Sequence, residues 1–263
     1  MIRLEKISKI FNEGTPDENQ AITDVDLHVK EGDFITIIGS NGAGKTTLFN
    51  LISGNLLPSE GRILVNDIDI TKVPEYKRAK YIGRIFQDPM MGTASNMSLE
   101  DNMMVCYRKG FKGLKISLNN QMREFFKEKL VRLDMGLEDR LKENVLRLSG
   151  GQRQALTLLM MVLSEPDLIL LDEHTAALDP KNARLILKLT REYIEEYKLT
   201  TMMVTHNMAQ AIEFGNRIIM MDKGEIILDI SGEEKKKLTV EKLVDKFHKI
   251  RHQELQNDEV LLS

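Results

Sequence analysis

Residues 39–46, GSNGAGKT, fit the spacing G-x-x-x-x-G-K-[ST] of loops that bind phosphate groups. The glycines let backbone N–H groups wrap around phosphates, Lys45 reaches the β- and γ-phosphates, and the Thr46 hydroxyl coordinates Mg²⁺. An apolar strand pattern precedes the loop and a helix pattern follows it, as the motif requires. We therefore expect a nucleoside triphosphate and Mg²⁺ to be bound by Gly39, Ser40, Asn41, Gly42, Ala43, Gly44, Lys45, Thr46 and Thr47.

Two carboxylates follow a buried strand pattern at residues 168–173, LILLDE. The carboxyl ends of parallel strands are where open α/β sheets bind ligands. Asp172 is placed to hold Mg²⁺, as an acid at this point does in phosphate-loop ATPases, and Glu173 is placed to align an attacking water as general base. Adjacent acids at a strand end are also common as solvated turn residues, but the phosphate loop upstream favours the chemical role.

Three further side chains are candidates for the nucleotide site, and each has a structural alternative. His206 ends the strand pattern TTMMVTH, where its imidazole would donate to the γ-phosphate, although a lone histidine is often structural. Gln87 stands where the α/β pattern changes to a helical one, so it either contacts Mg²⁺ and the attacking water or is a turn residue before Pro89. Phe11, at a strand end, either stacks on adenine or belongs to the core.

A second site for an anion is predicted at residues 147–156, RLSGGQRQAL. Ser149, Gly150 and Gly151 open a helix pattern with small residues. Such an opening presents bare backbone N–H groups and the positive end of the helix dipole. The phosphate loop already supplies one anion site, so this second one requires an anion of its own.

The periodicity predicts an α/β core with a mostly parallel sheet, an antiparallel β part near the N-terminus and a helical insertion. We expect the core to comprise residues 1–87 and 167–238, and the helical subdomain residues 88–166, where the pattern LNNQMREFFKEKLVRLDM is amphipathic. Residues 239–263 are expected to form a closing amphipathic helix and a tail. Its apolar stripe, which should pack on the core, contains Val240, Leu243, Val244 and Phe247.

Composition excludes several classes of protein. The 263 residues are 42% hydrophobic and 29% charged, with a net charge of −3, so the basic surplus of a general nucleic-acid binder is missing. The single cysteine, Cys106, leaves no internal disulfide. The N-terminal segment has no apolar block of a signal peptide, and the apolar runs fall short of the roughly 20 residues that span a bilayer. We expect a protein that works at a membrane only through a partner.

Taken in order, the phosphate loop, Gln87, LSGGQ, the acid pair, ALDP and His206 resemble the ATP-binding cassette (ABC) ATPases over nearly the whole chain. The resemblance implies a P-loop NTPase fold, ATP hydrolysis with Mg²⁺, and two subunits packed head to tail. Each LSGGQ segment would then cap the ATP of the other subunit through Ser149, Gly151 and Gln152. Asp179 of ALDP would communicate between the two sites. The second anion would be the partner's ATP.

The resemblance further implies an ATPase subunit of a bacterial transporter, more consistent with an importer of a small solute such as an amino acid. Its implied partners are a second copy or a homologous cassette, transmembrane permease subunits docked on residues 87–102, and indirectly an extracellular solute-binding protein, with no nucleic acid. It would lie at the cytoplasmic face of the membrane. The alternatives are an exporter subunit, or a soluble ABC ATPase that acts on nucleic acid or ribosomes. The chain departs from the common pattern after Glu173, where it has His174, Thr175 and Ala176.

Overall fold

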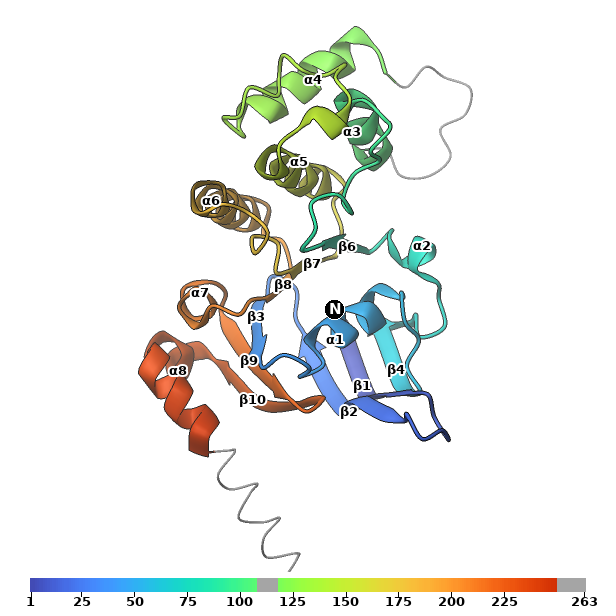
Figure 1. The fold of residues 1–263 in the computed structure, drawn as a ribbon, viewed down its shortest axis with the longest axis vertical. Coiled ribbons are helices and arrows are strands. Elements are labelled where there is room, and N and C mark those ends of the chain that lie inside the picture. Colours follow the sequence, from blue (N-terminus) through green and yellow to red (C-terminus); the bar gives the residue numbers. More distant parts are fainter. Residues whose placement is uncertain (108–117, 250–263) are drawn as a thin grey trace, which may run out of the picture. The chain divides into compact units, whose positions relative to one another are not determined.

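The computed structural model describes residues 1–107 and 118–249, and its elements are labelled in Figure 1. They form two compact units. Unit 1 comprises Met1–Ile52, Leu56–Thr71 and the chain from Met202 on, and unit 2 comprises Ser53–Asn55 and Lys72–Thr201. Unit 2 thus takes in strands and helices on both sides of the segment 88–166. The division into a core and an inserted helical subdomain at residues 88 and 166 stays a prediction.

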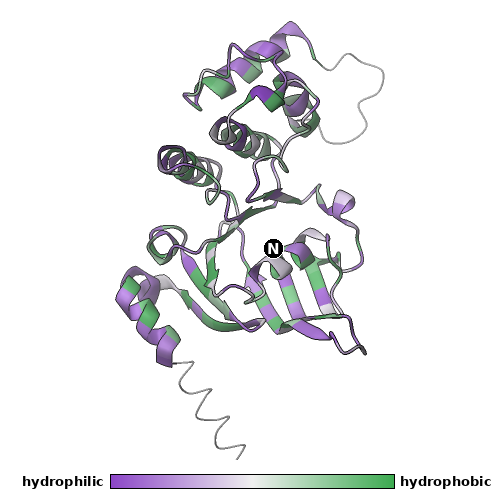
Figure 2. Cartoon of the chain, in the orientation of Figure 1, coloured by the Kyte–Doolittle hydropathy of each residue, from purple (hydrophilic) through white to green (hydrophobic). Residues whose placement is uncertain are grey.

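Unit 1 contains an antiparallel sheet with the strand order β2-β1-β4-β5. Its strands are β1 (Ile2–Phe11), β2 (Asn19–Val29), β4 (Glu60–Val65) and β5 (Ile68–Asp69). Ile2 lies opposite Val29 on one side and Val65 on the other. Apolar and polar residues alternate along β1, β2 and β4 (Figure 2), as expected for a sheet with one buried face. The antiparallel β part predicted near the N-terminus is confirmed.

A second set of strands in unit 1 has the order β10-β9-β3-β8. The strands are β3 (Phe34–Gly39), β8 (Thr201–Val204), β9 (Arg217–Asp222) and β10 (Glu225–Ser231). β3 and β9 are parallel, and β9 and β10 form an antiparallel hairpin. Helix α1 (Lys45–Ser53) follows β3, α7 (Met208–Glu213) contacts β3, and α8 (Gly232–Lys236) contacts β9 and β10. The interior of β3 is buried and is apolar except for Thr36, whose hydroxyl donates to the carbonyl of Ala211, as suits a parallel strand covered on both faces.

The predicted closing helix is present at residues 240–249. Leu243 is fully buried in a cluster with Ile218, Met220 and Leu238, and Phe247 packs against that cluster. Val240, by contrast, is 41% exposed. The helix therefore packs on the core through part of its predicted stripe. The rest of the predicted tail, residues 250–263, lies outside the described residues.

Unit 2 pairs two parallel strands, β6 (Ile82–Ile85) and β7 (Leu168–Asp172), with Arg84 opposite Leu170. Its helices are α2 (Glu75–Arg78), α3 (Leu99–Tyr107), α4 (Asn120–Val131), the short 3₁₀ turn η1 (Val145–Arg147), α5 (Gly150–Leu163) and α6 (Pro180–Tyr197). Helix α5 contacts α3, α4, α6 and β6, so it is buried along most of its length. Among the described residues, no helix has the length and apolar character needed to cross a bilayer.

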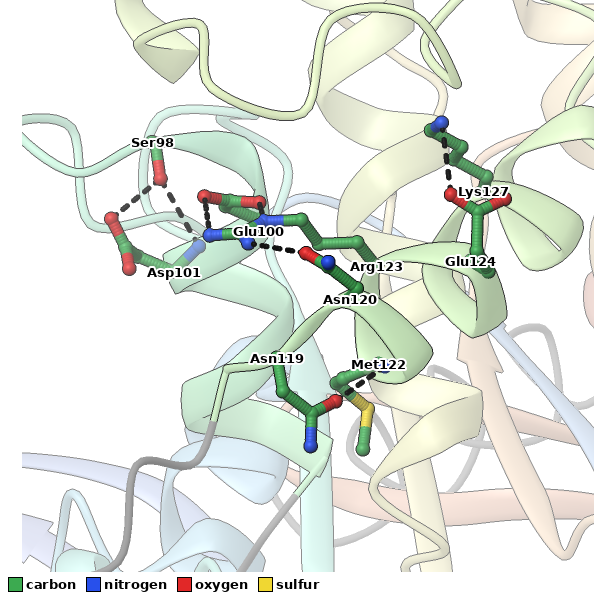
Figure 3. A network of polar contacts seen from close by, with 9 residues as sticks. All are labelled: Ser98, Glu100, Asp101, Asn119, Asn120, Met122, Arg123, Glu124 and Lys127. Carbon is green, nitrogen blue, oxygen red and sulfur yellow. Dashed lines mark hydrogen bonds and ion pairs between the residues drawn. The ribbon is translucent and has the colours of Figure 1, made fainter.

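Helices α3 and α4 are joined by a partly buried ion pair (Figure 3). Arg123 of α4 donates to both carboxylate oxygens of Glu100 on α3, at 2.8 and 3.2 Å, and Glu100 is only 6% exposed. Asn119 caps α4 by accepting from the backbone N–H of Met122. Of the predicted apolar face, Phe126, Leu130 and Leu133 are buried, whereas Met122 and Phe125 are only partly buried.

Candidate functional site

The phosphate-loop motif of unit 1 lies between the end of β3 and the start of α1. Gly39 passes so close to β9 that a Cβ atom there would be 2.2 Å from the carbonyl oxygen of Met221. Gly44 has φ +94°, and a Cβ on it would be 2.7 Å from the carbonyl oxygen of Ala21. Only glycine fits a positive φ combined with such close approaches. The tight path brings backbone N–H groups to the N-terminus of α1, as phosphate binding requires.

Side chains of the loop and of the β9–β10 turn hold this path. Lys45 is buried, and its ammonium donates to the carbonyl oxygens of Gly39 and Ser40 at 2.9 and 2.8 Å. The Ser40 hydroxyl donates to Asp222 Oδ1 at 3.0 Å, and the N–H of Gly224 donates to the carbonyl of Ala43. An ammonium group and a helix N-terminus therefore converge in a loop already shaped by the protein, and these donors fit a polyphosphate.

The other two candidates of unit 1 lie at strand ends. His206 is exposed in the loop between β8 and α7. That loop is fixed by the Thr205 hydroxyl, which donates to Gln210, and by Asn207, which caps α7 by accepting from the N–H of Gln210. Phe11 is only partly buried, with the ammonium of Lys9 5.3 Å from its ring centroid. Phe11 therefore lies outside the buried core, and its stacking on adenine stays a prediction.

In unit 2, Asp172 ends strand β7 and forms an ion pair that the sequence analysis missed. Arg84 Nη2 lies 2.7 Å from Asp172 Oδ2, and the two side chains are 8% and 10% exposed. The guanidinium carbon of Arg84 is also 4.7 Å from the ring centroid of Phe86, two residues along the chain. Arg84 thus orients the carboxylate predicted to hold Mg²⁺ and packs on the residue before Gln87.

Glu173 follows directly in the left-handed backbone conformation, with φ +47°. A non-glycine residue adopts this conformation at a cost of about 1 kcal/mol or more, so the surrounding structure must hold it. The carbonyl of Glu173 accepts from the N–H of Ala176, closing a turn at the end of β7.

Gln87 lies two residues after β6, and its side chain is exposed. The carboxyl ends of two paired parallel strands thus carry Gln87, Asp172 and Glu173.

The LSGGQ segment forms the N-terminus of α5. Ser149 is the N-cap: its Oγ accepts from the N–H of Gln152, and its own N–H donates to Gln152 Oε1. Gln152 Oε1 also accepts from Arg140, and Gln152 Nε2 donates to the carbonyl of Met135. This capping box leaves Ser149 and Gly150 exposed at the positive end of a long buried helix. Gln152 is engaged within unit 2, so its contact with a partner's nucleotide stays a prediction.

Asp179 is the N-cap of α6 and lies in the same unit as the LSGGQ segment. Its carboxylate accepts from the N–H groups of Lys181 and Asn182 and from the Asn182 side chain. Hydrogen bonds from Asn182 lower the pKa of Asp179 below its ordinary value. Asn182 also packs on Gly151, where a Cβ atom would be 2.5 Å from Asn182 Cγ. Asn182 therefore connects the predicted trans-site residue Gly151 with Asp179.

His174 follows Glu173 at the point where the chain departs from the pattern it resembles, and the structure gives it an internal role. It is 2% exposed, and its Nε2 lies 3.1 Å from Thr190 Oγ1 on α6. The Thr190 hydroxyl also donates to the carbonyl of Ile186, an arrangement that favours the His174 tautomer with its proton on Nε2. Burial lowers the pKa of His174 to about 4, which keeps the ring neutral near neutral pH.

Four contact residues were not found from the sequence: Arg84, Asp222, Asn182 and Gln154, whose amide donates to the carbonyls of Phe86 and His174. Each acts through a partner that is distant along the chain or on another element, and its own neighbourhood fits no motif. Two local signals were available in the sequence. One is the strand–turn–strand pattern around Asp222. The other is Arg84 in an apolar strand pattern, which indicates that a buried acid is needed beside it but not which acid.

The donors present suit Mg²⁺ bound with a nucleotide better than a metal held by the protein alone. Among the described residues, no group of three or more His, Cys, Asp and Glu side chains is arranged to hold a metal. Mg²⁺ at nucleotide sites usually takes one or two protein oxygens together with phosphates and waters. A carboxylate such as Asp172 and a hydroxyl such as Thr46 are donors of that kind.

The family model of the ABC transporter matches residues 22–176, more than half of the chain. The chain belongs to this family. It is the ATP-binding subunit of an ABC transporter and an ATPase coupled to transport. The family resemblance and the P-loop NTPase fold class predicted from the motifs are thereby confirmed.

Two relatives and one solved structure are similar to this cassette over most of its length. It is 40% identical to the tyrosine transport ATP-binding protein of Clostridioides difficile, over 94% of this chain and 98% of that protein. It is 32% identical to the phosphonates import ATP-binding protein PhnC of Lactococcus lactis subsp. cremoris, over 89% and 94%. The dimeric ATP-binding cassette MJ0796, in a post-hydrolysis state bound to ADP and Pi, matches with a TM-score of 0.73 and 28% identity, over 88% and 98%.

The buried His174 makes the stability of the cassette depend on pH. In the unfolded chain His174 is protonated near pH 6.5, whereas in the folded protein its pKa of about 4 delays protonation to lower pH. The unfolded state therefore binds more protons in this window, and the free energy of unfolding falls as pH decreases, by about 3 kcal/mol in all. Urea unfolding at several pH values should show a shallower fall for His174→Gln. His206→Gln controls for the loss of one histidine, and equal pH slopes in all three proteins would contradict the assignment.

Proposed function

We propose that this cassette powers the uptake of an amino acid or a similar small solute. The observation that carries the proposal is the 40% identity to a tyrosine transport ATP-binding protein over 98% of that protein's length. A second relative, PhnC, is named for the import of phosphonates, which supports import over export. The cassette does not contact the solute in this scheme, so the solute is set by partner subunits.

Within each copy, we assign the roles as follows. The loop at residues 39–47 binds the phosphates of ATP through Lys45, and Glu173 acts as general base toward water, with His206 donating to the γ-phosphate. Mg²⁺, when bound, neutralises charge on the phosphates, and Thr46, Asp172 and Gln87 would hold it. Phe11 stacks on adenine.

Two copies, or one copy and a homologous cassette, then pack head to tail. Ser149, Gly151 and Gln152 at the N-terminus of α5 contact the γ-phosphate held by the partner, and Asp179 communicates between the two sites. The solved dimer of the similar cassette MJ0796 supports an assembly of two. In unit 2, the exposure of Ser149 at a capped helix end supports its availability to a partner.

The energies involved suit a switch driven by ATP. A charge-assisted hydrogen bond contributes about 1.5–3 kcal/mol. Two such bonds at each of two sites give a gross ~6–12 kcal/mol before desolvation is subtracted. Moving an open–closed equilibrium from 1:99 to 99:1 requires about 5.5 kcal/mol. Hydrolysis of the γ-phosphate bond removes these contacts and reverses the closure.

The closing and opening of the cassette dimer move the permease subunits bound to it. These subunits hold the cassette at the cytoplasmic face of the membrane. The docking segment is residues 87–102, where Met90 and Met91 are 43% and 64% exposed. Flexible thioether side chains suit contact with an inserted helix. An extracellular solute-binding protein would supply the solute on the other side.

ATP should drive dimer formation when hydrolysis is blocked. Glu173→Gln should sediment as a dimer with ATP and Mg²⁺ and as a monomer with ADP, because the γ-phosphate joins the two copies. Adding Ser149→Arg should abolish the dimer while ATP binding to the monomer changes less than about threefold, since the phosphate loop is intact. A dimer that persists unchanged in Ser149→Arg would remove the LSGGQ segment from the interface.

Uptake in the cells that encode the protein tests the transport function itself. Deletion of the chain should reduce the uptake of labelled tyrosine or a related amino acid, and the wild-type chain should restore it. Glu173→Gln should not restore it, because closure without hydrolysis does not reset the transporter. Normal amino-acid uptake together with increased retention of another labelled compound would instead indicate an exporter.

A further inference from the structure

Gln154 is a buried amide on α5 that joins two loops of unit 2. Its side chain is 1% exposed, and Nε2 donates to the carbonyl of His174 at 2.6 Å and to the carbonyl of Phe86 at 3.3 Å. Both partners are carbonyl oxygens, so only the amide nitrogen can face them and the orientation of the group is settled.

The two carbonyls belong to residues adjacent to the proposed reaction groups. Phe86 immediately precedes Gln87, and its carbonyl is part of the peptide bond that joins them. His174 immediately follows Glu173. One side chain on α5 therefore fixes the backbone beside both the proposed Mg²⁺ ligand and the proposed general base.

Further contacts anchor both loops to other elements of unit 2. The Phe86 ring packs under the Arg84 guanidinium, which pairs with Asp172. The His174 ring bonds to Thr190 of α6. Each loop is thus held both by Gln154 and by a strand or another helix. A shift of α5 would therefore move one point of attachment of the loop relative to the other.

The same helix begins at the LSGGQ segment. Gln154 lies five residues after the N-cap Ser149, which is about 7.5 Å along an α-helix. The capping box with Gln152 holds that end in regular helical geometry. An interaction that moves or tightens the exposed end of α5 therefore acts on Gln154 through little more than one turn of rigid, buried helix.

The two halves of this amide are used unequally. Within the described part of the chain, Gln154 Oε1 is buried and has no hydrogen-bond partner. A buried acceptor without a partner costs free energy of folding. The donor half of the group, by contrast, is used twice, and both times on a loop next to a reaction group.

We propose that Gln154 is a positioning residue that transmits contact at the Ser149 end of α5 to the loops carrying Gln87 and Glu173. Binding of the partner's nucleotide would then organise the hydrolytic groups of the subunit that contributes the LSGGQ segment. This inference rests on the head-to-tail arrangement of the proposed function.

The test replaces Gln154 by methionine, which keeps the length of the side chain and removes the donor. The turnover number of Gln154→Met should fall about 10- to 100-fold, since small misplacements of reaction groups have effects of this size. ATP affinity, measured with a fluorescent analogue, should change less than about twofold because the phosphate loop is intact. Thr157→Val is the matched control: Thr157 is buried on the same helix, and its hydroxyl donates to the carbonyl of Arg153, within α5.

A double-mutant cycle with Ser149→Ala separates coupling from simple loss of structure. If Gln154 transmits the contact at Ser149, the Gln154→Met effect on turnover should shrink to less than about threefold once Ser149→Ala is present. All variants are assayed at a temperature at which circular dichroism shows them folded. The proposal would be overturned if Gln154→Met lowered the turnover number by the same factor with and without Ser149→Ala. It would also be overturned if the turnover number of Gln154→Met equalled that of Thr157→Val.

The outcome is distinguishable from a failure of the proposed function. If Glu173→Gln forms no ATP-dependent dimer, the head-to-tail arrangement itself is contradicted. If that dimer forms and Gln154→Met behaves like the control, only the role of Gln154 is lost.

Discussion

Helix α5 is buried along most of its length but exposed at its N-terminus, and unit 2 is organised by this constraint. The N-terminus of a helix leaves backbone N–H groups without intrahelical partners. Here the Ser149–Gln152 capping box binds only some of these N–H groups. The remaining dipole end faces outward while the body of the helix packs on α3, α4, α6 and β6. An anion bound at this end therefore interacts with a rigid element that reaches the centre of the unit.

Lys45 of unit 1 and Asp172 of unit 2 share a second constraint, because the protein itself already binds each of these charged groups. Lys45 is held by loop carbonyls, and Asp172 by Arg84. A buried charge without such contacts would be costly. Binding a nucleotide must therefore replace existing contacts by new ones. The net free energy of binding is then smaller than the sum of the new hydrogen bonds, but the groups are already held in a defined geometry.

The sequence revealed those features that depend on residues close together in the chain. The phosphate loop, the acid pair and the LSGGQ segment are contiguous, and their spacing alone specified a strand end, a loop and a helix start. The pairing of Arg84 with Asp172 and the bonds of Gln154 could not be predicted, because they depend on tertiary packing between distant segments. His174 was noted only as a departure from a pattern, and its burial against Thr190 required the structure.

The central claim is that one copy's phosphate loop and another copy's LSGGQ segment form a single ATP site. Two Glu173→Gln proteins with tags of different size test it, one also carrying Lys45→Ala and the other Ser149→Arg. A head-to-tail dimer of the two contains one intact site and one doubly altered site. The account predicts that each protein alone stays monomeric with ATP and Mg²⁺, whereas the mixture forms the mixed dimer on size-exclusion chromatography. A mixture that remains monomeric, while the parent Glu173→Gln protein dimerises, would contradict it.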